Sequence, residues 1–142
     1  MSADRQRTDF DVIVVGAGLS GICASHYLRE RCPQHSFAIL EARGALGGTW
    51  DLFRYPGIRS DSDMFTLGFS FRPWPGEDAI AEGGDILEYL RGAARASGAL
   101  SRIRYDSRVE GASWSSERSR WTLDVRTPTG LVQYTCGFLW AC

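Results

Sequence analysis

A glycine pattern near the start of the chain restricts the fold more than any other feature. Gly16, Gly18 and Gly21 spell G-x-G-x-x-G directly after the β-branched run of residues 12–15. A short run of this kind, bounded by glycine, is typical of a strand that is buried on both faces of a parallel sheet. The apolar positions that follow have helical spacing and stop at Pro33, which predicts an amphipathic helix. The sequence therefore predicts an α/β fold that begins with this strand.

A second apolar run, residues 36–40, ends in Glu41, which lies twenty residues after Gly21. We expect the strand, the helix and the second strand to form a right-handed β-α-β unit. In such units the glycines let a pyrophosphate approach the helix amides, and an acid at the end of the second strand accepts hydrogen bonds from a ribose. The combination favours dinucleotide binding over a purely structural turn. A carboxylate at position 41 disfavours a 2′-phosphate, so FAD or NAD is expected here rather than NADP.

Composition bounds the size of the fold and the kind of partner. The 142 residues, 44% of them hydrophobic, are enough to bury one core of ordinary size. The net charge is -1 and like charges do not form blocks, so no nucleic-acid partner is expected. The run after Asp9 and Asp11 is too short, and too often interrupted by glycine, to span a membrane or to act as a signal segment. We therefore predict a soluble, cytoplasmic protein without a transmembrane segment.

The four cysteines indicate neither a metal site nor a disulfide framework. They stand at positions 23, 32, 136 and 142 without a C-x-x-C pair, and the chain has only two histidines. We therefore expect reduced thiols and no bound metal. His26 is predicted on the first helix and His35 in a turn, so neither is a good candidate for an acid or a base.

The remaining chain divides into an aperiodic stretch and an ordered one. Residues 42–82 lack a sustained hydrophobic period, which in a compact domain is typical of a segment that wraps a ligand. A helix is predicted from Asp85, as its N-cap, to Gly98, as its stop. Short alternating segments, among them VQYTC, then predict an antiparallel meander. The final run, residues 137–142, predicts a separate buried strand, and because no polar tail follows it we expect the sequence to be truncated.

The aperiodic stretch resembles a known family. Residues 43–50, R-x-x-x-G-G-T-W, are similar to the signature of FAD-dependent class B monooxygenases. The following segment, DLFRYPGIRSDSDM, is similar to Baeyer-Villiger monooxygenases, and most of all to their ethionamide-activating branch. The resemblance implies a Rossmann-like FAD-binding domain over residues 9–142, with a parallel sheet and an added antiparallel β-meander. Residues 1–8, which precede the resemblance, are expected to form a flexible tail. The resemblance also implies that the NADPH-binding domain is absent from this chain.

The resemblance further implies which residues bind the cofactors. The pyrophosphate of FAD would lie along Gly16, Gly18 and Ser20, where Gly21 lets helix and strand pack closely, and the ribose would lie at Glu41. The rest of FAD, towards the flavin, would be lined by Gly48, Thr49 and Trp50. Asp61 would lie beside the flavin ring, and the backbone of Val109 would meet the adenine. The side where NADPH docks would be faced by Arg59, Ser60 and Asp61.

Several of these side chains also have plainer interpretations. Trp50 could pack its loop into the core. Asp61 and Asp63 could cap a short helix, Asp63 more readily than Asp61. Arg54 and Arg59 could be solvated surface charges.

Together these features predict the FAD-binding portion of an NADPH-dependent flavin monooxygenase. By resemblance, such an enzyme inserts oxygen into ketones or oxygenates sulfur or nitrogen centres, so its partner would be a small-molecule substrate of the ketone or thioether class. No catalytic residue is assigned within this chain, because the family's active-site arginine is expected beyond Cys142. Two other interpretations stay open. The chain could be a non-catalytic gene fragment or bare dinucleotide-binding module, or an NAD(P)- or FAD-dependent oxidoreductase without monooxygenase activity.

Overall fold

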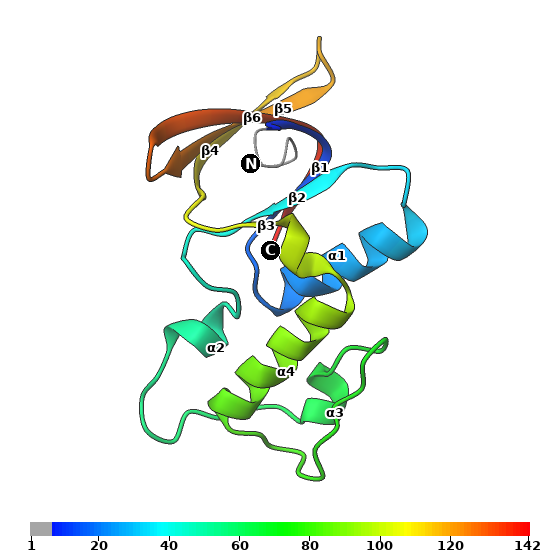
Figure 1. Cartoon of the computed structure of the whole chain (residues 1–142), viewed down its shortest axis with the longest axis vertical. Coiled ribbons are helices and arrows are strands. Elements are labelled where there is room, and N and C mark those ends of the chain that lie inside the picture. The colour runs from blue at the N-terminus through cyan, green and yellow to red at the C-terminus, as the bar shows by residue number, and fades with distance from the viewer. Residues whose placement is uncertain (1–6) are drawn as a thin grey trace.

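A central parallel strand organises the sheet in the computed structural model, which describes residues 7–142 (Figure 1). β1 (Asp9–Val15) lies between β2 (Phe37–Leu40) and β6 (Gly130–Ala141), and both neighbours run parallel to it. β3 (Ile103–Arg104) extends the parallel part beyond β2. β5 (Arg120–Thr127) and β4 (Arg108–Ser115) continue the sheet antiparallel beyond β6, giving the order β3-β2-β1-β6-β5-β4. The chain thus forms the predicted parallel sheet with an added antiparallel meander.

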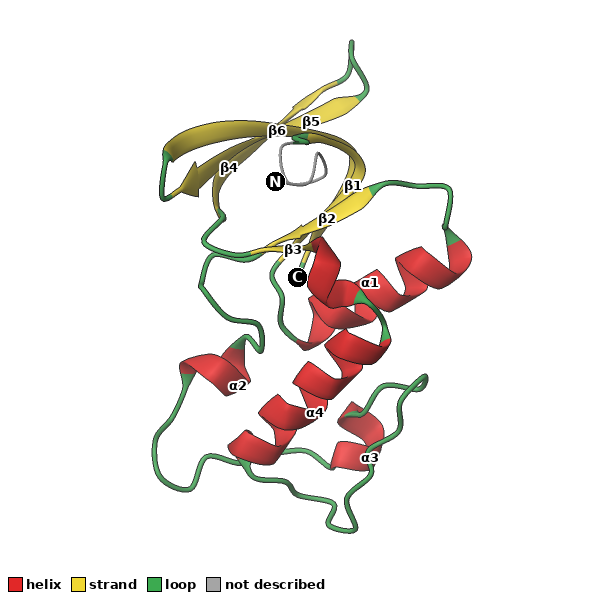
Figure 2. Cartoon of the chain, in the orientation of Figure 1, coloured by secondary structure: helices red, strands yellow, loops and turns green. Residues whose placement is uncertain are grey.

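The helices gather on one side of the parallel strands (Figure 2). α1 (Leu19–Arg31) packs against β1 and β2, and α4 (Gly83–Ala96) packs against α1. The short helices α2 (Thr49–Leu52) and α3 (Met64–Leu67) and the 3-10 helix η2 (Ala99–Arg102) lie in the connections. The core on this side includes Val14 of β1, Ile22 of α1 and Leu90 of α4. Within residues 7–142 no helix is long and apolar enough to cross a membrane.

A second core fills the inside of the curved sheet, where the meander faces the parallel strands (Figure 1). Phe10 and Ile13 of β1 point to this side and meet Leu123 and Val125 of β5. Because successive residues of a strand point to opposite faces, Ile13 serves one core and Val14 the other. β1 is therefore buried on both faces, as its β-branched run predicts.

β6 differs from the sequence-based expectation. The two strands predicted after residue 130 form one strand of 12 residues, whose first half pairs antiparallel with β5 and whose second half pairs parallel with β1. Phe138 and Trp140 lie opposite Val12 and Val14, on the helix side of the sheet, yet they are 58% and 39% exposed. The helices of the described chain leave this end of β6 uncovered. The prediction of a separate, buried final strand is therefore wrong.

The helix ends confirm some predicted boundaries and correct one. α4 begins at Gly83 after Glu82 as its N-cap, so Asp85 lies in the first turn of the helix and the prediction that it is the N-cap is wrong. An acid in the first turn still complements the positive end of the helix dipole. Gly98, with φ of 68°, follows α4 in the left-handed conformation and confirms the predicted stop. Asp63 caps α3 by accepting a hydrogen bond of 3.0 Å from the backbone amide of Thr66.

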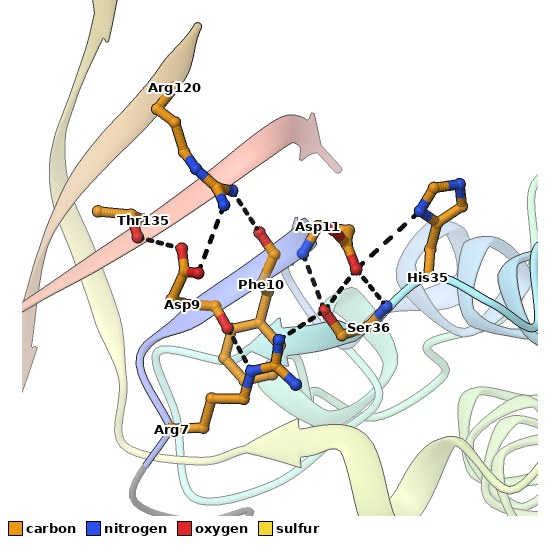
Figure 3. A network of polar contacts seen from close by, with 8 residues as sticks. All are labelled: Arg7, Asp9, Phe10, Asp11, His35, Ser36, Arg120 and Thr135. Atoms are coloured by element: carbon orange, nitrogen blue, oxygen red, sulfur yellow. Dashed lines mark hydrogen bonds and ion pairs between the residues drawn. The ribbon is translucent and has the colours of Figure 1, made fainter. Parts of the chain in front are cut away.

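A polar network attaches the beginning of β1 to its neighbours (Figure 3). The carboxylate of Asp11 accepts hydrogen bonds of 2.7 Å from both the backbone amide and the hydroxyl of Ser36, the residue before β2. These hydrogen bonds hold the pKa of Asp11 below its ordinary value. On the other side, the carboxylate of Asp9 lies 3.4 Å from the guanidinium of Arg120 in β5. The network therefore links β1 to the residue before β2 on one side and to β5, two strands away, on the other.

Of the predicted tail, residues 1–8, the structure describes only residues 7 and 8. Residues 1–6 lie outside the described residues. The backbone carbonyl of Thr8 accepts a hydrogen bond of 2.9 Å from the amide of Thr135 in β6. Thr8 is thus held against the sheet.

Candidate functional site

A cavity of about 300 Å³ opens at the carboxyl ends of β1 and β2, where α1 begins. Ligands of open α/β sheets bind at this end of the strands. The cavity brings together eight of the residues that the sequence predicts for cofactor binding: Gly16, Gly18, Ser20, Gly21, Glu41, Gly48, Thr49 and Trp50. Leu19, Gly47 and Cys142 complete its lining. A larger cavity of about 380 Å³, beside β3 and Tyr134, contains none of the predicted residues.

The glycine turn, residues 16–21, has a shape that requires glycine at positions 16 and 21. Gly16 has φ of 99°, a conformation that favours glycine. A Cβ atom on Gly21 would lie only 1.9 Å from the carbonyl oxygen of Gly16, so α1 could not start so close to β1. Gly18 provides no side-chain cap for α1, and the first amides of a helix have no partner within it. The turn therefore offers backbone donors to an anion.

Glu41 lies at the end of β2 and is buried, with 7% of its surface exposed. One carboxylate oxygen accepts a hydrogen bond of 2.7 Å from the amide of Ala17, and the other accepts one of 2.9 Å from the amide of Arg43. A carboxylate can accept about four hydrogen bonds, so both oxygens keep capacity for a ligand hydroxyl. Burial, and secondarily the charge of Glu41, raise the pKa of nearby Tyr105. The side chain is thus a fixed hydrogen-bond acceptor in the cavity wall.

The GGTW turn, residues 47–50, forms another part of the cavity wall. Gly47 and Gly48 have φ of 125° and 54°, and the amide of Gly47 donates a hydrogen bond of 3.0 Å to the carbonyl of Ala17. A Cβ atom on Gly48 would lie 3.1 Å from the Cα atom of Gly18, so the two turns touch. Trp50 is half-buried and packs against the helical core. Its predicted place along the cavity and its packing role are therefore compatible.

Asp51 directly follows Trp50 of the cavity lining, and no motif in the sequence predicts a role for it. Its carboxylate is buried and pairs with the guanidinium groups of Arg43 and Arg54. The Arg54 pair has a distance of 3.0 Å, and the side chain of Arg54 is 73% exposed, as its interpretation as a solvated surface charge predicts. The only signal in the sequence is the placement of one acid between two arginines in a segment without hydrophobic period.

The other predicted residues lie outside the cavity. Ser60 is buried, and its amide and hydroxyl exchange hydrogen bonds of 2.9 and 3.1 Å with the backbone of Ala81. Arg59 forms an isolated backbone bridge to Glu82, and Asp61 is exposed. Val109 lies in β4 and packs against the second core. Contacts of Arg59, Ser60, Asp61 and Val109 with a nucleotide stay predictions.

The described residues give no indication of a metal centre or a disulfide. No group of three or more His, Cys, Asp or Glu side chains that could hold a metal ion occurs within residues 7–142. Cys23, Cys32, Cys136 and Cys142 are all unpaired. Cys142 reaches the cavity because its amide donates a hydrogen bond of 3.1 Å to the carbonyl of Val15, beside the glycine turn.

Comparison with known proteins shows which proteins this chain resembles in sequence and in structure. The profile of the NAD(P)-binding Rossmann-like domain matches residues 14–75. FAD-containing monooxygenase EthA of Mycobacterium tuberculosis (strain ATCC 25618 / H37Rv) is 54% identical over 132 residues, which are 93% of this chain and 27% of that protein. The chain belongs to the class B flavin monooxygenases. It spans about a quarter of the length of its curated relatives and corresponds to their N-terminal, FAD-binding portion.

Solved structures of class B flavin monooxygenases support the same assignment. The structure of oxidized steroid monooxygenase bound to NADP has a TM-score of 0.85 at 32% identity, over 95% of this chain and 26% of that one. Cyclohexanone monooxygenase from Rhodococcus sp. Phi1 bound to NADP⁺ has a TM-score of 0.84 at 26% identity, with the same coverage of 95% and 26%. The predicted family and the predicted Rossmann-like fold are thus confirmed.

Proposed function

We propose that the chain binds FAD in the cavity at the carboxyl ends of β1 and β2, as the FAD-binding portion of an NADPH-dependent monooxygenase. The observation that carries the proposal is the convergence of the glycine turn, the buried carboxylate of Glu41 and the GGTW turn on one cavity. These groups fit a dinucleotide, because close backbone approach suits a pyrophosphate and a fixed carboxylate suits a ribose. When bound, FAD would supply the redox chemistry of the oxygenation.

Each wall of the cavity has a separate task in this proposal. The amides at the start of α1, together with Gly16 and Gly18, hold the pyrophosphate. Glu41 accepts hydrogen bonds from the ribose hydroxyls with the capacity that Ala17 and Arg43 leave free. The GGTW turn with Trp50 orients the part of FAD that leads to the flavin and excludes water from it. Asp61 beside the flavin and Val109 at the adenine complete the proposed FAD contacts.

The full enzyme would use NADPH and a small-molecule substrate. The steroid and cyclohexanone monooxygenases with the same fold are bound to NADP, which supports NADPH as the reductant, and the name of the second supports a ketone as the substrate class. Thioethers are the second class that we propose. Arg59, Ser60 and Asp61 would form one edge of the NADPH site, while the binding of this chain to a ketone or thioether would require further parts of the enzyme.

The test uses protein produced from the complete reading frame that contains these 142 residues. We expect the visible absorption of bound flavin in the purified protein, and saturable binding when FAD is added back to the stripped protein. NAD, titrated in parallel, should bind much more weakly. Absence of any flavin signal at saturating FAD, or equal binding of NAD and FAD, would contradict the proposal. FAD binding without substrate-dependent NADPH consumption would favour a non-catalytic module.

A further inference from the structure

Asp51 is a buried carboxylate for which the FAD site described above gives no role. It lies in α2, directly after the GGTW turn, and only 2% of its side chain is exposed. A buried carboxylate is costly unless it is paired and hydrogen-bonded. Asp51 meets this condition through two arginines, Arg43 on one oxygen and Arg54 on the other. Such a placement indicates a function for the charge rather than a chance position.

The Asp51–Arg43 pair connects the two walls of the cavity. The guanidinium of Arg43 also donates a hydrogen bond of 3.3 Å to the carbonyl of Gly48 in the GGTW turn. The backbone amide of the same arginine donates to Glu41 at 2.9 Å. Arg43 therefore contacts the proposed ribose acceptor with its backbone and the proposed flavin-side turn with its side chain, and Asp51 holds that side chain in place.

The packing around Asp51 leaves the turn little freedom. A Cβ atom on Gly47 would lie 3.0 Å from the Cβ atom of Asp51 and 2.5 Å from a methyl carbon of Leu87, so the turn packs closely against α2 and α4. Arg43 and Arg54, by contrast, are 33% and 73% exposed and can be solvated when the carboxylate is neutralised. Loss of its charge should thus loosen the turn without unfolding the domain.

We propose that Asp51 is a positioning residue for FAD, which fixes the GGTW turn through Arg43 and so sets the wall along which the flavin half of the cofactor lies. The inference rests on the proposed function. A wall that is rigid before the cofactor arrives lowers the ordering cost of binding. The effect should concern the flavin half more than the adenosine half, because Glu41 and the glycine turn keep their own hydrogen bonds without Asp51.

The experiment compares Asp51→Asn with wild type in the protein from the complete reading frame, using FAD and AMP as separate ligands. Asp51→Asn keeps the size of the side chain and removes its charge. We expect FAD affinity to fall by about tenfold, the effect of losing a charge-assisted hydrogen bond, while AMP affinity stays within about twofold. The matched control is Asp63→Asn, a carboxylate of the same long segment whose partner Thr66 lies outside the cavity, and it should change neither affinity.

Two further variants keep the inference falsifiable if Asp51→Asn does not fold. Arg43→Gln removes the same pair from its other side and should show the same split between FAD and AMP, whereas Arg54→Gln, on the exposed partner, should show little. Unchanged FAD affinity would overturn the inference, and so would equal losses for FAD and AMP, which indicate a general structural role. Failure of wild type to bind FAD would instead refute the proposed function itself.

Discussion

Glu41 is the charged side chain that lines the proposed FAD cavity in the described chain. Glu41→Ala removes the ribose acceptor and also leaves the amides of Ala17 and Arg43 without their partner. A hydrogen bond to a charged group contributes about 1.5 to 3 kcal/mol, so FAD affinity should fall by about tenfold or more. The measurement is a fluorescence titration with FAD. Glu82→Ala, on an exposed residue outside the cavity, is the control, and an equal effect of both changes would refute the assignment.

Gly21 tests the steric reason for the glycine pattern. In Gly21→Ala the new methyl group would overlap the carbonyl oxygen of Gly16, and backbone atoms cannot move aside as a flexible side chain can. We expect the free energy of unfolding to fall by about 1 to 3 kcal/mol, as for other overpacked positions, with loss of FAD binding. Urea unfolding measures the effect. The control is Gly84→Ala in the first turn of α4, where a Cβ atom would meet nothing within 4 Å. It should leave the free energy of unfolding unchanged or raise it slightly. A destabilisation as large as that of Gly21→Ala would count against the steric argument.

At the scale of elements, the junction of β1 and β2 should make stability depend on pH (Figure 3). The hydroxyl and amide of Ser36 lower the pKa of Asp11 in the folded state. A group with a depressed folded pKa stabilises the fold above its unfolded pKa of about 3.9, and this contribution is lost as the pH falls through the folded pKa. Asp11→Asn should therefore lower the urea midpoint at pH 7 and differ less from wild type near pH 3. Glu117→Gln, on an exposed residue, should show no such convergence, and a constant difference between Asp11→Asn and wild type at both pH values would contradict the prediction.

Local patterns predict the elements whose signals are local. The buried run before Gly16 and the helical spacing up to Pro33 define β1 and α1, because steric limits and periodicity act within one segment. The exposure of β6 depends on which helix lies over it, a contact between distant segments. The start of α4 is hidden because two glycines, Gly83 and Gly84, form its first turn although glycine disfavours helix interiors.

The candidate site shows the same division between local and distant information. The glycine turn and Glu41 follow from motif spacing, and the structure places them around one cavity. Asp51 could not be found in this way, because its importance comes from an ion pair with Arg43, eight residues earlier in a segment without a period. Ser60 is the converse case. The sequence places it at the NADPH side, but in the structure its amide and hydroxyl form hydrogen bonds with the backbone of Ala81, outside the cavity.

At the scale of the whole molecule, the two faces of the mixed sheet carry the hydrophobic cores, and the ends of its parallel strands carry the proposed binding cavity. β1 carries residues of both cores along its length and ends in the glycine turn, so packing on both faces fixes the position of the cavity. β6 joins the meander to the parallel strands and brings Cys142 to the same cavity. The cavity is thus built from segments that lie far apart in the sequence and are aligned by parallel strand ends.

The uncovered end of β6 should govern how these 142 residues behave by themselves. Phe138 and Trp140 expose large apolar surface on the helix side of the sheet, where the helices of the described chain leave them uncovered. Because burial of apolar area contributes about 25 cal/mol per Å², two copies should associate through this strip at high concentration. We expect the double change Phe138→Thr and Trp140→Thr to shift the chain towards monomer in size-exclusion chromatography with light scattering. Leu131→Thr, on an equally exposed leucine at the start of β6, should not, and a wild-type chain that stays monomeric over the whole concentration range would refute the role of the strip.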